Sequence, residues 1–228
     1  MEKPTQPIQA VIFDCDGVLV DSEILASQVS LRMLEPYGFK MSPPEYAKAF
    51  AGKVEQDILS LIQQNYQIEL PDDFLSKLRL EIEHALDHDL QPIPGVKETI
   101  GEIPVTKAVV SNSRLARVIS SLKLAGLTEA FGKKIFSAEM VEHPKPAPDV
   151  YLLAASELGV DPAQCLVVED SQSGVMAAHR AGMQVIGFLA ASHIPEGHDQ
   201  TVRKEGAFAT ASSMKELGQM LQKIFEEN

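Results

Sequence analysis

The chain has 228 residues, of which 45% are hydrophobic and 23% are charged, and its formal net charge is −12. This composition is typical of a folded globular protein with one core domain, with or without an insert, and argues against a disordered chain. Nucleic acids and anionic membranes are bound by neutralising their phosphates, so the acidic charge and the lack of any Lys/Arg block argue against both as partners.

The sequence also bears on the compartment. It has no run of 18 apolar residues that could span a membrane, and the polar start Met1–Pro7 lacks the apolar stretch of a signal peptide. Cys15 and Cys165 lie in apolar runs, where we expect small buried side chains and not a disulfide. We therefore expect a cytoplasmic protein with reduced thiols, as a monomer or a weak homo-oligomer.

The first predicted element is a buried parallel strand, because its residues are apolar and β-branched and stop abruptly at acidic residues and a glycine. Similar runs recur along the chain, with helical patterns between them. The predicted strands are Ile8–Phe13, Val105–Val110, Lys134–Phe136, Cys165–Val168, Val185–Phe188 and a final short run at Ala207–Ala209; the predicted helices are Arg114–Ala125, Asp149–Leu158, Gly174–Ala181 and Met214–Glu226. This alternation predicts an α/β fold with a doubly wound parallel sheet, a Rossmann-like core that binds ligands at the carboxyl ends of its strands.

Residues 22–91 interrupt the alternation. Apolar residues recur there at helical spacing, as in Ile58 and Ile62, and no convincing strand is present. Prolines and glycines divide the segment into about four helices, and roughly 70 residues is far more than a loop in a compact domain needs. We predict a helical cap at 22–91, inserted into a catalytic core formed by 1–21 and 92–228.

Polar residues follow the ends of four predicted strand or loop segments. Taken singly, each group has a simpler interpretation as a turn, a helix cap or a solvated lysine. Two carboxylate pairs at the ends of two apolar strands are costly to bury without a partner, however, and converging oxygen ligands are what Mg²⁺ requires. The groups are Asp14, Asp16 and Asp21; Ser111 and Asn112; Lys145 between two prolines; and Glu169 and Asp170, followed by Gly174.

In order and spacing, these motifs resemble the haloacid dehalogenase superfamily over essentially the whole core. The pattern runs Asp-x-Asp-Gly-x-x-x-Asp from Asp14, then Ser111, then Lys145, then Glu-Asp-x-x-x-Gly from Glu169. The helical insert after the first motif is similar to members with a small cap. The Glu-Asp form of the last motif resembles the β-phosphoglucomutase and phosphoglycolate-phosphatase-like subgroup.

The resemblance implies a Mg²⁺-dependent phosphohydrolase. Asp14 would be the nucleophile that forms an aspartyl-phosphate, and Asp16 the general acid and base. Ser111 and Lys145 would bind the transferring phosphoryl oxygens, because a carboxylate that attacks a phosphate dianion needs positive charge beside it. The implied metal ligands are Asp14, the backbone carbonyl of Asp16, Asp170 and, directly or through one water, Glu169.

Substrate selection is expected from the cap loop around Gly52 and Lys53. Gly52 permits a tight turn, and Lys53 would reach the non-reacting end of the substrate, with a solvated lysine as an equal alternative. Asn112 and Arg114 are further candidates for substrate binding, with an exposed side chain as the alternative for Arg114. The small-residue run Gly187–His193 could line the cleft, although a plain surface loop is the simpler interpretation.

We expect a phosphatase for a small phosphorylated metabolite, either a sugar phosphate or a phosphoglycolate-like acid. Asp16 favours phosphate chemistry over halide release, since halide leaves without a proton. One alternative is a β-phosphoglucomutase-like mutase, although resembling mutases carry an arginine in the cap loop where Val54–Gln56 stand here. The other is a non-catalytic protein that binds a phosphometabolite, against which the intact Asp14 and Lys145 argue.

Overall fold

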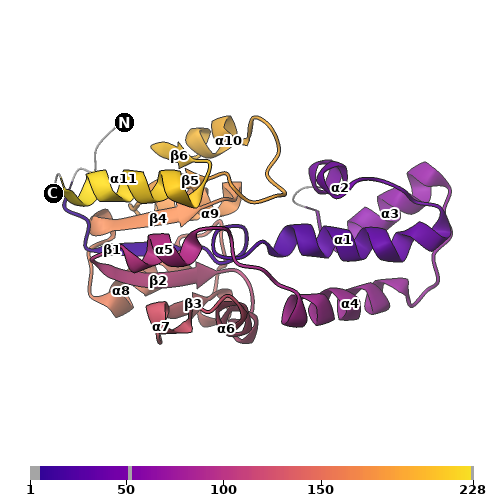
Figure 1. The fold of residues 1–228 in the computed structure, drawn as a ribbon, viewed down its shortest axis with the longest axis horizontal. Coiled ribbons are helices and arrows are strands. Elements are labelled where there is room, and N and C mark those ends of the chain that lie inside the picture. Colours follow the sequence, from indigo (N-terminus) through magenta and orange to yellow (C-terminus); the bar gives the residue numbers. More distant parts are fainter. Residues whose placement is uncertain (1–5, 51–52, 227–228) are drawn as a thin grey trace.

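The computed structural model describes residues 6–50 and 53–226, which form a sheet flanked by helices and a helical group that projects from one end of it (Figure 1). All paired strands are parallel, in the order β3-β2-β1-β4-β5-β6. This order is that of doubly wound folds, so the predicted fold class is confirmed. The strands are β1 (Ala10–Phe13), β2 (Thr106–Ser111), β3 (Ile135–Ser137), β4 (Cys165–Glu169), β5 (Gln184–Phe188) and β6 (Ala209–Ala211).

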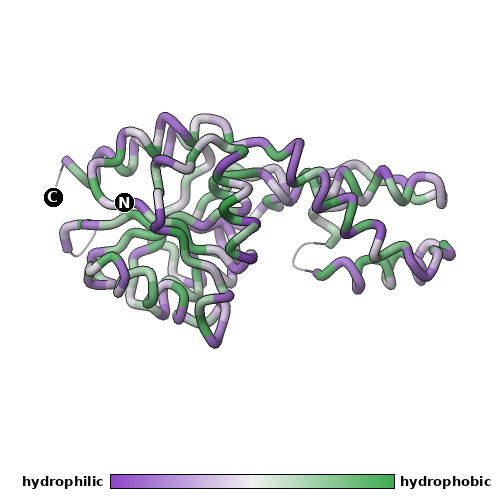
Figure 2. Tube along the Cα trace, turned by 90° about the horizontal axis from the view of Figure 1, so that it is seen from below, coloured by the Kyte–Doolittle hydropathy of each residue, from purple (hydrophilic) through white to green (hydrophobic). Residues whose placement is uncertain are grey.

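Helices cover both faces of the sheet. Alternate residues of β1 point to opposite faces, so that Val11 and Phe13 pack with the helices of one layer while Ala10 and Ile12 pack with those of the other. The first layer holds α5 (Val96–Gly101), α6 (Leu115–Leu124), α7 (Thr128–Phe131) and α11 (Met214–Glu226); the second holds α8 (Asp149–Leu158), α9 (Gln172–Arg180) and α10 (His198–Lys204). Burial on both faces explains the continuous apolar runs in the sequence, which Figure 2 shows along the strands.

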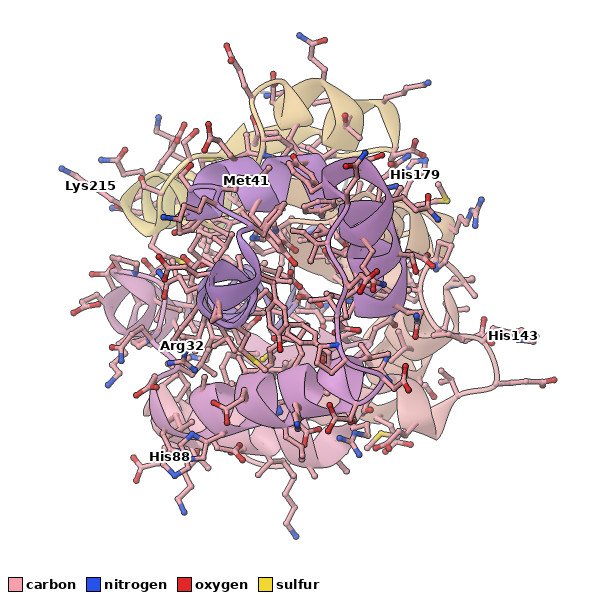
Figure 3. The ribbon with its side chains drawn as sticks, turned by 90° about the vertical axis from the view of Figure 1, so that its right-hand side faces the viewer. Arg32, Met41, His88, His143, His179 and Lys215 are labelled. Carbon is pink, nitrogen blue, oxygen red and sulfur yellow. The ribbon has the colours of Figure 1, made fainter. Side chains whose placement is uncertain are left out.

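The helical insert, defined here as the helices that follow β1 and precede α5, has its own apolar cluster. Leu34, Phe39 and Ile62 are buried in this cluster and separate from the two clusters of the sheet. Figure 3, viewed from the insert side, shows these helices nearest the viewer, with Arg32 labelled left of centre. The helices are α1 (Ser22–Leu34), α2 (Pro43–Phe50), α3 (Glu55–Tyr66) and α4 (Phe74–His88), with the 3-10 turn η1 (Glu35–Tyr37) after α1.

The two passages of the chain between sheet and insert lie side by side. The N–H of Asp21 donates to the carbonyl of Gln91 (3.2 Å), and the N–H of Ile93 donates to the carbonyl of Leu19 (3.0 Å). These bonds form a short antiparallel pair at the base of the insert.

The structure refines several predicted elements. The final strand lies at Ala209–Ala211, two residues later than predicted. The short helices α5, α7 and α10 were not predicted, because four to seven residues are too few to show a helical period. Two further 3-10 turns are η2 (Ala138–Met140) and η3 (Pro162–Gln164). Within 6–50 and 53–226, no helix is long and apolar enough to cross a membrane. Cys15 and Cys165 are buried and free.

Candidate active site

Asp14 is the first residue after β1, and its backbone N–H donates to the carbonyl of Val168 in β4 (3.0 Å). Its side chain lines a cavity at the carboxyl ends of the strands and is only slightly exposed. Burial raises the pKa of the Asp14 carboxyl, against the opposing effect of Lys145. One carboxylate oxygen is bound to Lys145, which leaves the other available to a ligand.

Lys145 joins the acidic residues of two strands. Its buried Nζ donates to Asp14 Oδ1 (2.6 Å), Glu169 Oε1 (2.6 Å) and the carbonyl of Val110 (3.0 Å), which uses all three of its protons. It also lies 4.9 Å from the centre of the Tyr151 ring, a favourable cation–π distance. Burial alone would lower its pKa, but the charges of Asp14 and Glu169 outweigh that effect and raise it, so the amine stays protonated.

Glu169, the last residue of β4, is fully buried, and both of its oxygens are saturated with donors. Oε1 accepts from Lys145 Nζ and from the Tyr151 hydroxyl (3.1 Å), and Oε2 accepts from the N–H and the hydroxyl of Ser171 (3.0 Å each). Gly174 allows this packing, because a Cβ there would lie 1.7 Å from Oε1. Glu169 therefore holds Lys145 in place from outside the set of residues that line the cavity.

Asp170 follows directly and is also buried. Its Oδ2 pairs with His193 Nε2 (3.2 Å), and its backbone carbonyl lies 2.6 Å from His198 Nε2. Gly17, at a φ of +81°, lets the loop after β1 approach closely, since a Cβ there would lie 1.9 Å from Asp170 Oδ2. The pKa of Asp170 is raised by burial, an effect that His193 opposes.

Asp16 is held by hydroxyl groups. Its Oδ1 accepts from Ser22 (2.7 Å), and its Oδ2 accepts from Ser113 (2.8 Å) and from Ser111 at 3.5 Å. These donors fix its carboxylate in the cavity that Asp14 also lines.

Asp21, the third acid of the first motif, lies apart from this group. Its Oδ2 accepts from the hydroxyl (2.5 Å) and the N–H (3.3 Å) of Ser192. Of the two interpretations of Gly187–His193, the end of the run fits the lining of the cleft: Ser192 bonds Asp21, and His193 lines the cavity. Local sequence could not reveal this, because the two partners are about 170 residues apart.

The four predicted substrate-binding residues lie in different environments. Asn112 lines the cavity, but its amide atoms bind the backbone N–H (3.0 Å) and carbonyl (3.1 Å) of Lys145. Arg114 is 71% exposed and pairs with Glu83 of α4 (3.1 Å), outside the residues that line the cavity. Lys53 does line it, and Gly52 lies outside the described residues. Their roles in substrate binding stay predictions.

The cavity has a volume of about 610 Å³ and lies between the strand ends and the helical insert. This volume is in the range of small-molecule sites. From the sheet side it is lined by Asp14, Asp16, Ser111, Lys145 and Asp170. From the insert it is lined by residues that include Glu23, Ser27, Ser30, Tyr46, Phe50 and Lys53.

Three buried carboxylates at this site fit a divalent cation. Oxygens of Asp14, Glu169 and Asp170 lie within 4.8 Å of one another. Among the described residues, Lys145 pairs with Asp14 and Glu169, and His193 offsets Asp170 only when it is protonated, so a cation would relieve the remaining negative charge. Carboxylate oxygens are the ligands that Mg²⁺ and Ca²⁺ prefer.

Several residues of the site escaped the sequence prediction. Tyr151 lies in α8 and gives no local signal, because a helical pattern does not say which residue faces a distant strand. Arg117 lines the cavity where Arg114 was predicted, and the difference depends on where α4 packs. Ser113 was within reach of prediction, as a second hydroxyl beside Ser111.

Comparisons with known proteins agree with this geometry. The family described as haloacid dehalogenase-like hydrolase matches residues 11–188. The chain is 30% identical to a 6-phosphogluconate phosphatase of Escherichia coli over 187 residues, covering 82% of this chain and 85% of that protein. It is 32% identical to the fructose-1-phosphate phosphatase YqaB of the same species, covering 77% and 94%. A crystal structure of a hydrolase of this family from Deinococcus radiodurans, with bound phosphate and sodium, superposes with a TM-score of 0.86 at 33% identity, covering 96% of each chain.

Proposed function

The chain belongs to the haloacid dehalogenase-like hydrolase family and is a phosphatase, and we propose that it hydrolyses a small sugar phosphate or related acid through an aspartyl-phosphate on Asp14. One observation carries the proposal. Asp14 has a free carboxylate oxygen in the cavity, while its other oxygen is bound to the buried ammonium of Lys145. A carboxylate held in this way is suited to attack phosphorus, since the lysine offsets part of the charge repulsion.

In the first step, an Asp14 oxygen forms a bond to phosphorus and the bond to the leaving alcohol breaks. Asp16 gives its proton to the leaving oxygen, which departs as the neutral alcohol. In the second step, the Asp16 carboxylate takes a proton from water, the water oxygen bonds to phosphorus, and the bond to Asp14 breaks. The hydroxyls of Ser22 and Ser113 hold Asp16 in position for both transfers.

The phosphoryl oxygens are proposed to bind Ser111 at the end of β2 and Lys145 in the loop before α8, where Lys145 would exchange one of its three present hydrogen bonds for a bond to phosphate. A divalent cation, which we propose to be Mg²⁺, would be held by Asp14, Asp170 and the backbone carbonyl of Asp16. Glu169 would act through Lys145 or through a water, because each of its oxygens already accepts two hydrogen bonds. The bound cation supplies positive charge beside the transferring phosphoryl group.

We also propose that residues 22–91 act as a cap over a core of 1–21 and 92–228. The positions of α1–α4 between β1 and β2 support this division, as does their separate apolar cluster. The mutase alternative has weaker support than the phosphatase, since the relatives described above are named as phosphatases.

Release of phosphate from p-nitrophenyl phosphate in the presence of Mg²⁺ tests the proposal. We expect turnover by the wild type and a loss of at least a thousandfold in Asp14→Asn. Asp72→Asn is the matched control, since Asp72 is exposed in the loop before α4 and outside the cavity. Turnover that persists in Asp14→Asn would overturn the nucleophilic role.

A further inference from the structure

We propose that the insert side of the cavity binds hydroxyl groups, so that the preferred substrate is a polyhydroxylated alcohol with a single phosphate. This inference rests on the proposed function, because it concerns the alcohol that leaves. The hydroxyl wall, defined as Ser27 and Ser30 of α1 and Tyr46 of α2, carries it.

One face of α1 points into the cavity with polar side chains. Glu23, Ser27 and Ser30 are spaced at i, i+4 and i+7, so they share one face, and all three line the cavity. Ser27 and Ser30 are only 6% and 4% exposed. Apolar residues are usual at such buried positions of a helix, and burial of a hydroxyl costs free energy unless it is paired.

The hydroxyl wall has unused hydrogen-bonding capacity. Ser30 donates its one proton to the carbonyl of Ala26 (2.8 Å), so its oxygen can still accept hydrogen bonds. Ser27 has no hydrogen-bond partner within the described residues, although it is more than nine-tenths buried. A hydroxyl can donate one bond and accept two, so these groups can pair with the hydroxyls of a sugar or alditol.

The charges around the wall argue against a second phosphate. Arg117 is already paired with Asp87 of α4 (2.6 Å), and Glu55 is paired with Arg79 (3.6 Å). Among the described residues that line this part of the cavity, the charges without an ion pair are Lys53 and Glu23, which have opposite signs. The wall therefore has no surplus of positive charge to offset a second dianion.

Two matched substrate pairs test the inference. Glucitol 6-phosphate and hexyl phosphate have the same carbon count but differ in hydroxyl groups, and fructose 1-phosphate and fructose 1,6-bisphosphate differ in the second phosphate. We expect kcat/KM to be at least tenfold higher for the first member of each pair. Equal values, or a preference for hexyl phosphate or the bisphosphate, would overturn the inference.

Variants of the wall make the test residue-specific. Ser30→Ala and Ser27→Ala should each lower the ratio of kcat/KM for glucitol 6-phosphate to that for hexyl phosphate by roughly two- to tenfold, as expected for one hydrogen bond. Ser60→Ala is the matched control, because Ser60 makes the same bond to the carbonyl four residues earlier (2.8 Å) on α3, outside the cavity. This control should leave the ratio unchanged.

One outcome separates this inference from the proposed function, and another tests Ser27 alone. If the ratio does not change in either variant of the wall while Asp14-dependent turnover of p-nitrophenyl phosphate persists, the hydroxyl wall is refuted and the phosphatase is not. Ser27→Cys keeps the size of the side chain and weakens its hydrogen bonding, so it covers the case in which Ser27→Ala fails to fold. A normal ratio in a folded Ser27→Cys would refute the role of Ser27.

Discussion

Replacement of Gly174 by alanine tests how tightly Glu169 is held behind Lys145. Gly174 is the third residue of α9, and helix propensity alone would make alanine more stabilising by about 0.5–1 kcal/mol. The added Cβ would lie 1.7 Å from Oε1 and 2.4 Å from Oε2 of Glu169. Because that carboxylate is fully buried and bonded on all sides, it can move only by breaking hydrogen bonds.

The magnitude follows from the number of bonds broken. A hydrogen bond to a charged group contributes about 1.5–3 kcal/mol, so losing two of the four costs roughly 3–6 kcal/mol. After subtraction of the gain in helix propensity, we expect Gly174→Ala to lower the free energy of unfolding by about 2–5 kcal/mol. For a chain of this length, that is a fall in Tm of roughly 5–20 °C. The displaced Glu169 would also shift Lys145, so kcat should fall at least tenfold.

Urea unfolding, thermal unfolding and the phosphatase assay measure these effects together. Gly218→Ala in α11 is the matched control, because the nearest atoms to its Cβ belong to Thr99 at 3.6 and 3.7 Å, an ordinary contact. It should raise the free energy of unfolding by about 0.5–1 kcal/mol. A Gly174→Ala protein with unchanged Tm and kcat would show that Glu169 does not depend on this packing.

Four further predictions concern the same site. Tyr151→Phe removes a donor to buried Glu169 and should lower the free energy of unfolding by about 1.5–3 kcal/mol in urea titrations, whereas no change would contradict that bond's role. Asp16→Asn should reduce kcat more for a sugar phosphate than for p-nitrophenyl phosphate, whose leaving group needs no proton; the opposite order would refute Asp16 as the acid. Mg²⁺ at 100 times its Kd should stabilise the protein by about 2.7 kcal/mol and raise Tm by roughly 5–10 °C, and failure of EDTA to reverse this would refute a specific cation site. Burial lowers the pKa of His193, but the hydrogen bond and charge of Asp170 outweigh burial and raise that pKa above 6.5. Protonated His193 therefore stabilises the metal-free protein fully below about pH 6.5, and this stabilisation is lost as the pH rises through the raised pKa. In EDTA, the unfolding free energies of wild type and His193→Asn should therefore converge with rising pH, and a gap that widens would contradict this sign.

The acidic and hydroxyl residues predicted for the site share one physical property: they lie at or directly after the ends of strands. Parallel strands place their carboxyl ends along one edge of the sheet, so the sequence alone predicts that Asp14, Ser111 and Asp170 lie close together there. Their proximity in the structure needs no information beyond strand positions and polarity. The prediction of Lys145 rested on the resemblance and not on any strand end.

The residues that escaped prediction depend on how helices and loops pack. Tyr151 reaches Glu169 only because α8 lies against the second face of the sheet. His193 reaches Asp170 only because the loop after β5 folds back over the strand ends. Arg114 and Arg117 are one helical turn apart at the start of α6, but only Arg117 lines the cavity. Each pairs with an acidic residue of α4 that lies about 30 residues earlier in the chain. A single sequence carries no local signal for such contacts.

The paired passages at the base of the insert have a consequence for how the molecule is assembled. Asp21 is hydrogen-bonded to Gln91, and Leu19 to Ile93. From the side of the sheet, the insert is therefore equivalent to a loop whose two ends are held together. Doubling the length of such a loop costs only about 0.6 kcal/mol in closure entropy. Helices could be added, removed or exchanged beyond that junction without changing the register of β1 and β2. The architecture thus lets the part that we propose to select the alcohol vary as an independent module, while the residues at the strand ends stay the same.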